Sequence, residues 1–244
     1  SSFSADGFDP SSRFTWPSRF AREPLPMTKP LASALFLASA LFLALASGPA
    51  LAQSAVKCEI KKLEAALIPS PQINSSYSKK SAQGQPSPWL EIDAEIDIPQ
   101  PDKNGPKLGE DLTVNYYILL NNKSLTEDGK ATLLTGSVSH AEYLYGKGLH
   151  VGAFVSPQTL LKFFSGETPR NINQAVVDLG VTISDSTGVI ARKASKSQVR
   201  DDKGWWDNTE KYTEVTGRVL AKSDTPFTHL AWDYYLPEKP KSGL

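Results

Sequence analysis

In the segment 89–98, positions 90 to 98 alternate strictly between apolar and acidic side chains. Since successive side chains of a β-strand point to opposite faces, this period of two predicts a strand with one buried face and one solvated face. Prolines at positions 88 and 99 mark its two ends. Such a strand needs a second layer to cover its apolar face, which favours a fold built from sheets. The apolar set is Leu90, Ile92, Ala94, Ile96 and Ile98, and the acidic set is Glu91, Asp93, Glu95 and Asp97.

Several other segments show alternation or a strand-like composition. Residues 112–121 are the clearest, and residues 175–184 and 189–193 flank a glycine-containing turn, as expected for a hairpin. A single short helix is predicted to begin at Pro157, because Ser156 can cap it, and to end near Gly166. Weaker strands are predicted at residues 56–63, 131–143 (with a bulge or break at Gly136), 149–155, 214–220 and 229–235.

About eight strands, one helix and no regular alternation of strands with helices indicate the fold class. The chain is predicted to be all-β, an antiparallel immunoglobulin-like β-sandwich with one short helix. Residues 53–240 are expected to form this single domain, and residues 241–244 a frayed tail.

The N-terminal part of the chain has the pattern of an export signal. Met27 is the only methionine, so residues 1–26 are expected to be an upstream extension without regular structure. Residues 27–52 combine a positive start at Lys29, an apolar run and a small-residue site at positions 50–52. This arrangement is typical of a cleaved signal peptide, with an uncleaved signal anchor as the alternative.

Cleavage is predicted between Ala52 and Gln53. The apolar run is shorter than the roughly 20 residues that cross a bilayer, so we expect the mature form to have no stable membrane span. No cysteine occupies the first mature position, which argues against a lipoprotein signal. The expected location is the periplasm or the cell surface after Sec-type export.

Charge and cysteine content narrow the expected partners. Cleavage removes four basic and three acidic side chains, which changes the formal charge from zero to −1. This balance gives no electrostatic reason to expect nucleic acid or an anionic membrane as a partner. Cys58 is the only cysteine and alternates with Val56 and Ile60, so a buried thiol is favoured over an intermolecular disulfide.

Few residues suggest catalysis. His140, His150 and His229 are widely spaced, and neither the zinc-binding spacings nor the local motifs of nucleophilic hydrolases and phosphate loops occur. We therefore expect no enzyme activity, no metal and no cofactor. A spatial triad cannot be read from sequence, so a hydrolase that uses one of these histidines remains a third hypothesis.

The four carboxylates of residues 89–98 form the most distinctive cluster of polar side chains in the sequence. It is compatible with calcium binding or with a basic partner. However, carboxylates two residues apart on a strand are about 6.5 Å from each other, too far to share one ion without loop ligands. The favoured interpretation is a solvated strand face with lysines from a neighbouring strand opposite.

The adjacent Trp205 and Trp206 are the candidate binding surface. In a strand their side chains would point to opposite faces, so one is expected in the core. The other would cover a sheet edge, a sugar or a partner. Trp232 and Tyr234 are expected on one side of a terminal strand, as packing residues.

Three segments of the chain resemble a known family. Residues 89–95, 149–157 and 225–235 are similar to segments of the pilus-like, immunoglobulin-fold exported proteins encoded beside type IV pilus genes in certain Gram-negative bacteria. The resemblance implies a periplasmic or surface β-sandwich with a role in pilus assembly and no known active site. True type IV pilins keep a long apolar N-terminal helix after processing, whereas the expected cut here removes the apolar run. An accessory component is therefore implied.

These observations lead to a hypothesis and an alternative. We expect an exported, non-enzymatic interaction protein whose partners are other envelope or pilus proteins or a second copy of itself. An exposed sheet edge or an aromatic face would make the contact. The alternative is a carbohydrate- or ligand-binding module that uses Trp205 and Trp206 as a stacking platform.

Overall fold

The computed structural model describes residues 56–71, 87–200, 202–231 and 233–240. The expected upstream extension, the expected signal peptide with its cut between Ala52 and Gln53, and the tail at 241–244 lie outside these residues. No helix within the described ranges is long and apolar enough to cross a membrane.

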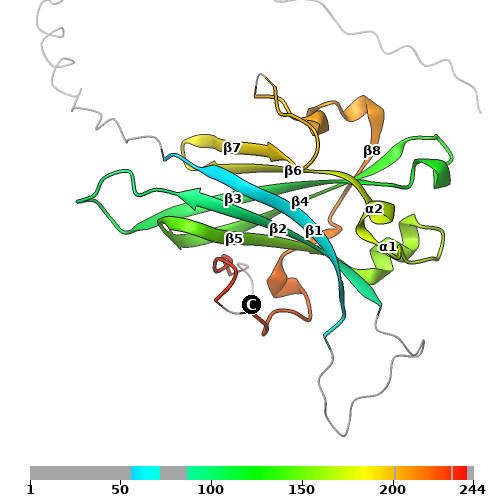
Figure 1. The fold of residues 1–244 in the computed structure, drawn as a ribbon, viewed down its shortest axis with the longest axis horizontal. Coiled ribbons are helices and arrows are strands. Elements are labelled where there is room, and N and C mark those ends of the chain that lie inside the picture. Colours follow the sequence, from blue (N-terminus) through cyan, green and yellow to red (C-terminus); the bar gives the residue numbers. More distant parts are fainter. Residues whose placement is uncertain (1–55, 72–86, 201, 232, 241–244) are drawn as a thin grey trace, which may run out of the picture. The chain divides into compact units, whose positions relative to one another are not determined.

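Two sheets pack face to face as a sandwich (Figure 1). The first sheet is antiparallel throughout. The second is antiparallel except for the parallel pair of β4 and β8. In spatial order, the four-stranded sheet contains β1 (Glu59–Pro69), β2 (Pro88–Ile98), β5 (Gly146–Val155) and β9 (Val219–Leu220). The five-stranded sheet contains β7 (Gly188–Ala194), β6 (Val176–Asp185), β3 (Leu108–Leu120), β4 (Ala131–Leu144) and β8 (Tyr212–Thr216).

The inward faces of the two sheets form one large core. All five apolar residues of the alternating segment in β2 are at most 1% exposed. They share the core with inward residues of β3 and β6, including Tyr116, Ile118 and Val181. The strand predicted at 89–98 and the sandwich class are confirmed.

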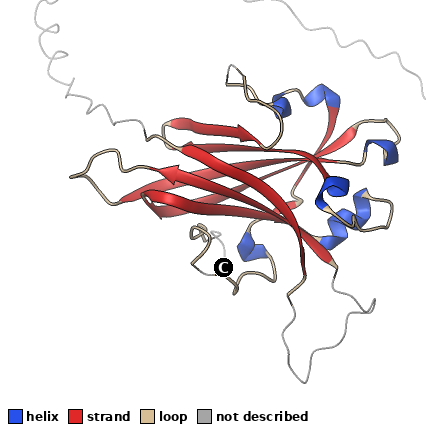
Figure 2. Ribbon diagram, viewed as in Figure 1, coloured by secondary structure: helices blue, strands red, loops and turns tan. Residues whose placement is uncertain are grey.

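The helices are few and short, and they lie with the loops around the ends of the strands (Figure 2). The predicted helix is α1 (Pro157–Phe163), and its cap is Ser156, whose Oγ accepts a hydrogen bond from Thr159 N at 3.3 Å. Four residues of α2 (Ile172–Ala175) form a further helical turn that is too short to have left a periodic signal. The described ranges also contain four 3₁₀ turns: η1 (Lys123–Leu125), η2 (Trp205–Asp207), η3 (Thr209–Lys211) and η4 (Lys222–Asp224).

Gly136 does not make a bulge or a break in β4. The register between β3 and β4 is continuous and places Gly136 opposite Tyr116. A Cβ at Gly136 would instead lie 2.6 Å from Val219 Cβ, which is closer than side chains approach. The glycine is therefore needed because β9 of the other sheet packs directly against it.

The predictions for the C-terminal part of the chain were partly wrong. The expected strand at 214–220 is two strands in different sheets, separated by Gly217 in the left-handed region (φ +70°). The expected strand at 229–235 is not formed: residues 229–231 and 233–235 make turns and bends, with one isolated bridge between Tyr235 and His150. Trp232 lies outside the described residues, so its predicted packing beside Tyr234 is not described.

Residues 221–239, here called the C-terminal strap, cover one open side of the sandwich. Leu236 N donates to His150 O of β5 at 2.8 Å, and Lys239 N donates to Ser139 O of β4 at 2.7 Å. His140 Nδ1 donates to Pro237 O at 2.9 Å. The strap thus hydrogen-bonds to the edges of both sheets and joins them.

Candidate functional site

The side of the sandwich opposite the strap is formed by β1 and β7. Among the described strands, β1 pairs with β2 alone and β7 with β6 alone. Lys193 lies opposite the buried Val181 in the register of β6 and β7, so its side chain starts on the inner face. Its Nζ donates to Ile60 O at 2.9 Å and to Lys61 O at 2.8 Å. One end of the β1 edge is therefore occupied by a lysine from the other sheet.

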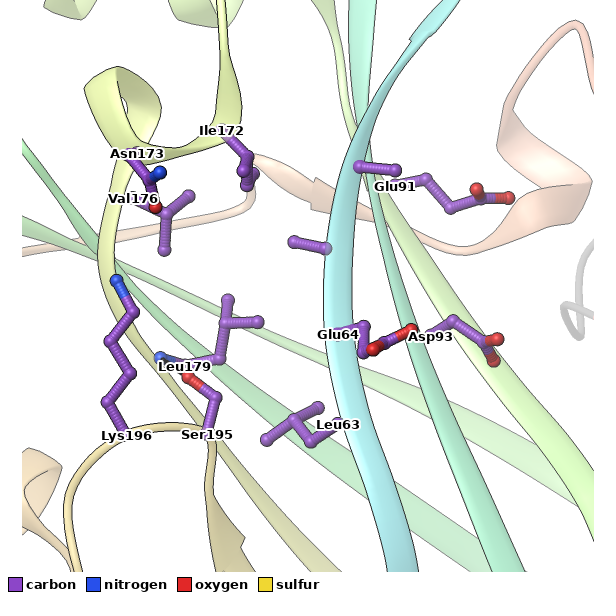
Figure 3. A pocket seen from close by; sticks show the side chains of 12 residues that line it. Leu63, Glu64, Glu91, Asp93, Ile172, Asn173, Val176, Leu179, Ser195 and Lys196 are labelled. Carbon is purple, nitrogen blue, oxygen red and sulfur yellow. Dashed lines mark hydrogen bonds between the residues drawn. The ribbon is translucent and has the colours of Figure 1, made fainter.

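Beyond the end of β7, a groove with a volume of about 450 Å³ opens between β1 and the opposite sheet (Figure 3). We call it the β1 groove. Leu63, Glu64, Ala65 and Ala66 form the wall on β1. The other wall combines apolar side chains with a polar rim and contains Ile172, Asn173, Val176, Leu179, Ser195 and Lys196.

The groove exists because β7 is shorter than the strands around it. The pairing of β6 with β7 stops at Gly180 and Ala194, whereas β6 begins at Val176. β1 continues past this point to Pro69. The start of β6 therefore has no strand from β7 beside it, and its apolar side chains line the groove.

Asp178 fixes the chain where it leaves β7. Its carboxylate accepts hydrogen bonds from Leu179 N, Ser195 Oγ, Lys196 N and Ser197 N at 2.8 to 3.1 Å. Burial alone would raise the pKa of Asp178, but these hydrogen bonds together hold the pKa below its ordinary value. Asp178 thereby positions Ser195 and Lys196 on the wall of the groove.

The outer rim of the groove on β1 is acidic. In the register of β1 with β2, Glu64 lies opposite Asp93, and Ala66 lies opposite Glu91. Like charges in direct opposition on one sheet face are unfavourable. Lys62 Nζ lies 2.8 Å from Glu64 Oε2 and offsets part of this charge.

The acidic set of β2 lies on the outer face of its sheet, as expected, and Lys62 lies opposite Glu95. The face is less solvated than expected, because the strap crosses it. Tyr234 Oη donates to Asp93 Oδ2 and Tyr235 Oη to Glu91 Oε1, both at 2.8 Å. Burial, followed by the contact with Glu91, raises the pKa of Tyr235. Within the described ranges, no cluster of three or more side chains is arranged to hold a metal ion.

Trp205 and Trp206 lie in the 3₁₀ turn η2, not in a strand. Trp206 is 3% exposed and stacks on Tyr117 with ring centroids 4.9 Å apart. Its ring also lies against the bare backbone of Gly180, where any Cβ would collide with it. Trp205 is half-buried and meets the Trp206 ring edge to face at 5.5 Å. The pair is therefore no flat platform, because one ring is buried and the two planes are nearly perpendicular.

The three histidines lie on different elements. His140 is buried in β4, and this burial lowers its pKa. His150 lies on the outer face of β5, where its Nδ1 is 3.0 Å from Asp93 Oδ1, and His229 belongs to the strap.

The thiol of Cys58 is half-buried just before β1, and burial, with a smaller contribution from Asp97, raises its pKa to about 12. This thiol is protonated at neutral pH and weakly nucleophilic.

Sequence reasoning missed the β1 groove. It arises from the unequal lengths of strands that are far apart in the chain. Two local signals were present: an acidic residue, Asp178, inside an apolar run, and a lysine, Lys193, at an inward position of a strand.

Comparison with known proteins agrees with this architecture. A crystal structure of a protein from Akkermansia muciniphila superposes with a TM-score of 0.62 at 18% sequence identity, covering 76% of this chain and 94% of that one. At this level of identity the likeness shows the fold alone. No curated protein matches the chain. One protein-family model matches residues 49–242, and the chain therefore belongs to that family of β-sandwich proteins.

Proposed function

We propose that this chain is an exported, non-enzymatic interaction protein that serves as an accessory component of a pilus or of the bacterial envelope. The observation that carries the proposal is the contrast between the two sides of the sandwich. The strap covers the edges of β4 and β5, whereas no described strand pairs with the outer edge of β1, which lies beside a groove.

A free strand edge is a surface that other chains can pair with. Natural sheets blunt such edges with charges, prolines or covering segments. Here Lys193 protects one end of β1 by donating hydrogen bonds to the carbonyl groups of Ile60 and Lys61, and the other end of the strand is Pro69. The stretch between them borders the β1 groove, and no strand of the described residues pairs with it, so a partner could do so.

The chemistry of the groove also suits binding. Its lining is half apolar and half polar: apolar side chains of both walls lie beside Glu64, Glu91, Asp93, Asn173, Ser195 and Lys196. Such a lining recognises an apolar segment through contact and orients it through a few polar groups. The envelope and pilus part of the proposal rests on the export-signal pattern and on the family resemblance.

Site-specific crosslinking tests the proposal in cells. A photoreactive phenylalanine analogue is placed at Ala66, which is exposed at the groove, and at Glu127, which is exposed in a loop, as the matched control. We expect the variant at 66 to give a discrete adduct with an envelope protein, identified by mass spectrometry, and the control to give none. A product found in the cytoplasm, or adducts that are the same for both positions, would contradict the proposal.

N-terminal sequencing of the exported product tests the predicted signal cleavage. The first residue found should be Gln53.

The glycan-binding alternative would rest on Trp205, since Trp206 is almost fully buried. Fluorescence titration with envelope and host glycans, compared between the native chain and Trp205→Ala, tests it. A saturable shift that Trp205→Ala abolishes would favour this alternative over a protein partner.

A further inference from the structure

We propose that the β1 groove accepts an extended polypeptide segment as an added strand of the four-stranded sheet, and that this segment alternates apolar side chains with lysine or arginine. The inference rests on the proposed function and specifies the chemistry of the partner.

The backbone of β1 sets where the added strand lies. β1 is the terminal strand of its sheet, so one of its edges has no strand beside it among the described residues. Lys193 already donates to the carbonyl groups of Ile60 and Lys61. The added strand therefore pairs with the part of β1 beyond Lys61, which is the part that lines the groove.

The groove determines which side chains the added strand can have at its inward positions. Alternate side chains of that strand point between the two sheets, about 6.5 Å apart. They would meet Leu63 and Ala65 on one side and Ile172, Val176 and Leu179 on the other. The volume of about 450 Å³ falls within the range of known binding pockets and suits apolar side chains at two alternate positions.

The acidic rim determines which charge is favoured on the outward side chains of the added strand. They lie on the same face as Glu64, which already has Asp93 directly opposite it. Next to it, the small side chain of Ala66 leaves space toward Glu91. Lys62 offsets part of the charge on Glu64, and Lys196 on the opposite wall is the cation of the groove lining. The lining still holds three carboxylates, Glu64, Glu91 and Asp93, against this one lysine. A cationic side chain on this face therefore relieves the repulsion between the carboxylates, and an anionic one adds to it.

Peptide binding to the ¹⁵N-labelled full chain tests the inference. Two eight-residue peptides with blocked ends are compared, one alternating valine with lysine and the other alternating valine with glutamate. We expect the lysine peptide to bind about tenfold more tightly, because two outward positions change from attraction to repulsion. The amide signals of residues 63–67 should shift, and those of β8 should not.

Two further peptides separate strand addition from simple occupation of the groove. Both have the valine and lysine sequence, and each carries N-methyl groups on alternate residues, so that the backbone N–H groups of one edge are blocked in the first and those of the other edge in the second. If the peptide adds as a strand, methylating the edge that faces β1 weakens binding about tenfold through lost hydrogen bonds, and methylating the other edge does not. Equal affinities of the two methylated forms would overturn strand addition.

Two variants with a control locate the site on the protein. Glu64→Lys should reverse the preference between the two peptides, and Glu127→Lys, an exposed loop variant, should leave it unchanged. Ala65→Lys places a lysine into the groove, where it would take the space of the inward side chains of the added strand, and should abolish binding. Circular dichroism checks the folding of Ala65→Lys, and the surface variant Glu64→Lys carries the test if that protein is unfolded.

The remaining outcomes are decisive as well. If neither peptide binds, or if β1 pairs with a second copy when no peptide is present, the inferred partner chemistry is wrong. If the crosslink from position 66 still forms in that case, the proposed function stands and only the strand-addition inference fails. If the crosslink is also absent, both fail.

Discussion

The two open sides of this sandwich differ in how their strand edges are protected from pairing with other chains. On one side the edges of β4 and β5 are covered by the strap, which hydrogen-bonds to both and carries its own aromatic cluster. On the other side a single lysine, Lys193, connects β7 to β1 and leaves a groove beyond it. Covering a strand edge removes it from contact with other chains, whereas the lysine protects only one end. The less protected side is thus where association is expected.

The covered side is held mainly by aromatic contacts. Phe227 of the strap stacks on Phe154 at 5.1 Å and meets Trp89 edge to face at 5.6 Å. Tyr235 lies against Gly152, where a Cβ would be 2.5 Å from its ring. The open side has no comparable cluster around the β1 groove in the described part of the chain. The comparison therefore predicts unequal effects of substitutions on the two sides.

The largest effect is expected for Phe227→Ala. This change should lower the free energy of unfolding by about 3 kcal/mol, because it removes a buried ring from between two aromatic neighbours. Urea denaturation measures it. As the control on the other side, Val189→Ala, at a position 52% exposed in β7, should change stability by less than about 0.5 kcal/mol. Similar losses in the two variants would contradict the unequal roles of the two sides.

Asp178→Asn should cost about 2 kcal/mol at neutral pH, since a buried carboxylate that accepts four hydrogen bonds is replaced by an amide that cannot accept all of them. The pKa of Asp178 is lower in the folded chain than in the unfolded chain. Its stabilising contribution is therefore present above about pH 4 and is lost as the pH falls toward the folded pKa.

Urea denaturation at a series of pH values from neutral to acidic checks this sign. The native chain should lose stability more steeply below about pH 4 than Asp178→Asn, and the difference between the two should shrink. A difference that is constant with pH would show that the charge of Asp178 is not what stabilises the exit from β7.

Lys193→Met should have a smaller effect on stability, about 1 kcal/mol, because two hydrogen bonds from an ammonium group at the sheet edge are lost. The change frees more of the β1 edge. Light scattering should therefore detect more self-association than for the native chain, and Lys193→Arg should behave like the native chain. A monomeric Lys193→Met protein at high concentration would show that this lysine does not protect the edge.

The smallest effect is expected for Tyr234→Phe, about 0.5 kcal/mol, because the lost hydrogen bond to Asp93 lies at a residue that is 47% exposed. Desolvation and the contact with Asp93 raise the pKa of Tyr234 to about 12. Ultraviolet titration should show one phenol fewer in the high-pH part of the curve. An unchanged curve would indicate that Tyr234 does not contact Asp93 in solution.

The local parts of this fold could be predicted from sequence. The alternation in β2 and the Ser156–Pro157 pair at the start of α1 are signals within single segments, and both correspond to the structure. Such signals are readable because side-chain direction and capping depend on neighbours in the chain.

The remaining parts depend on contacts between distant segments. Gly136 looked like a strand irregularity, but its reason is Val219 in the other sheet. The expectation that only one of Trp205 and Trp206 is in the core agrees with the structure, but its basis, opposite faces of a strand, does not apply, because a 3₁₀ turn lays Trp206 on Gly180. The groove follows from the end of β7 relative to β1, which no local pattern encodes.

The position of the strap in the chain bears on the order in which the molecule is built. β9 and the strap follow all the other described strands, yet they contact Gly136, Ser139 and His150 in the middle of the sequence. Wherever the chain emerges from its N-terminal end, these covering residues come late, so β4 and β5 appear with their edges uncovered. A chain that lacks the strap would expose two strand edges to its neighbours and be prone to aggregate. The strap must therefore be present for both strand edges to be covered in the folded protein.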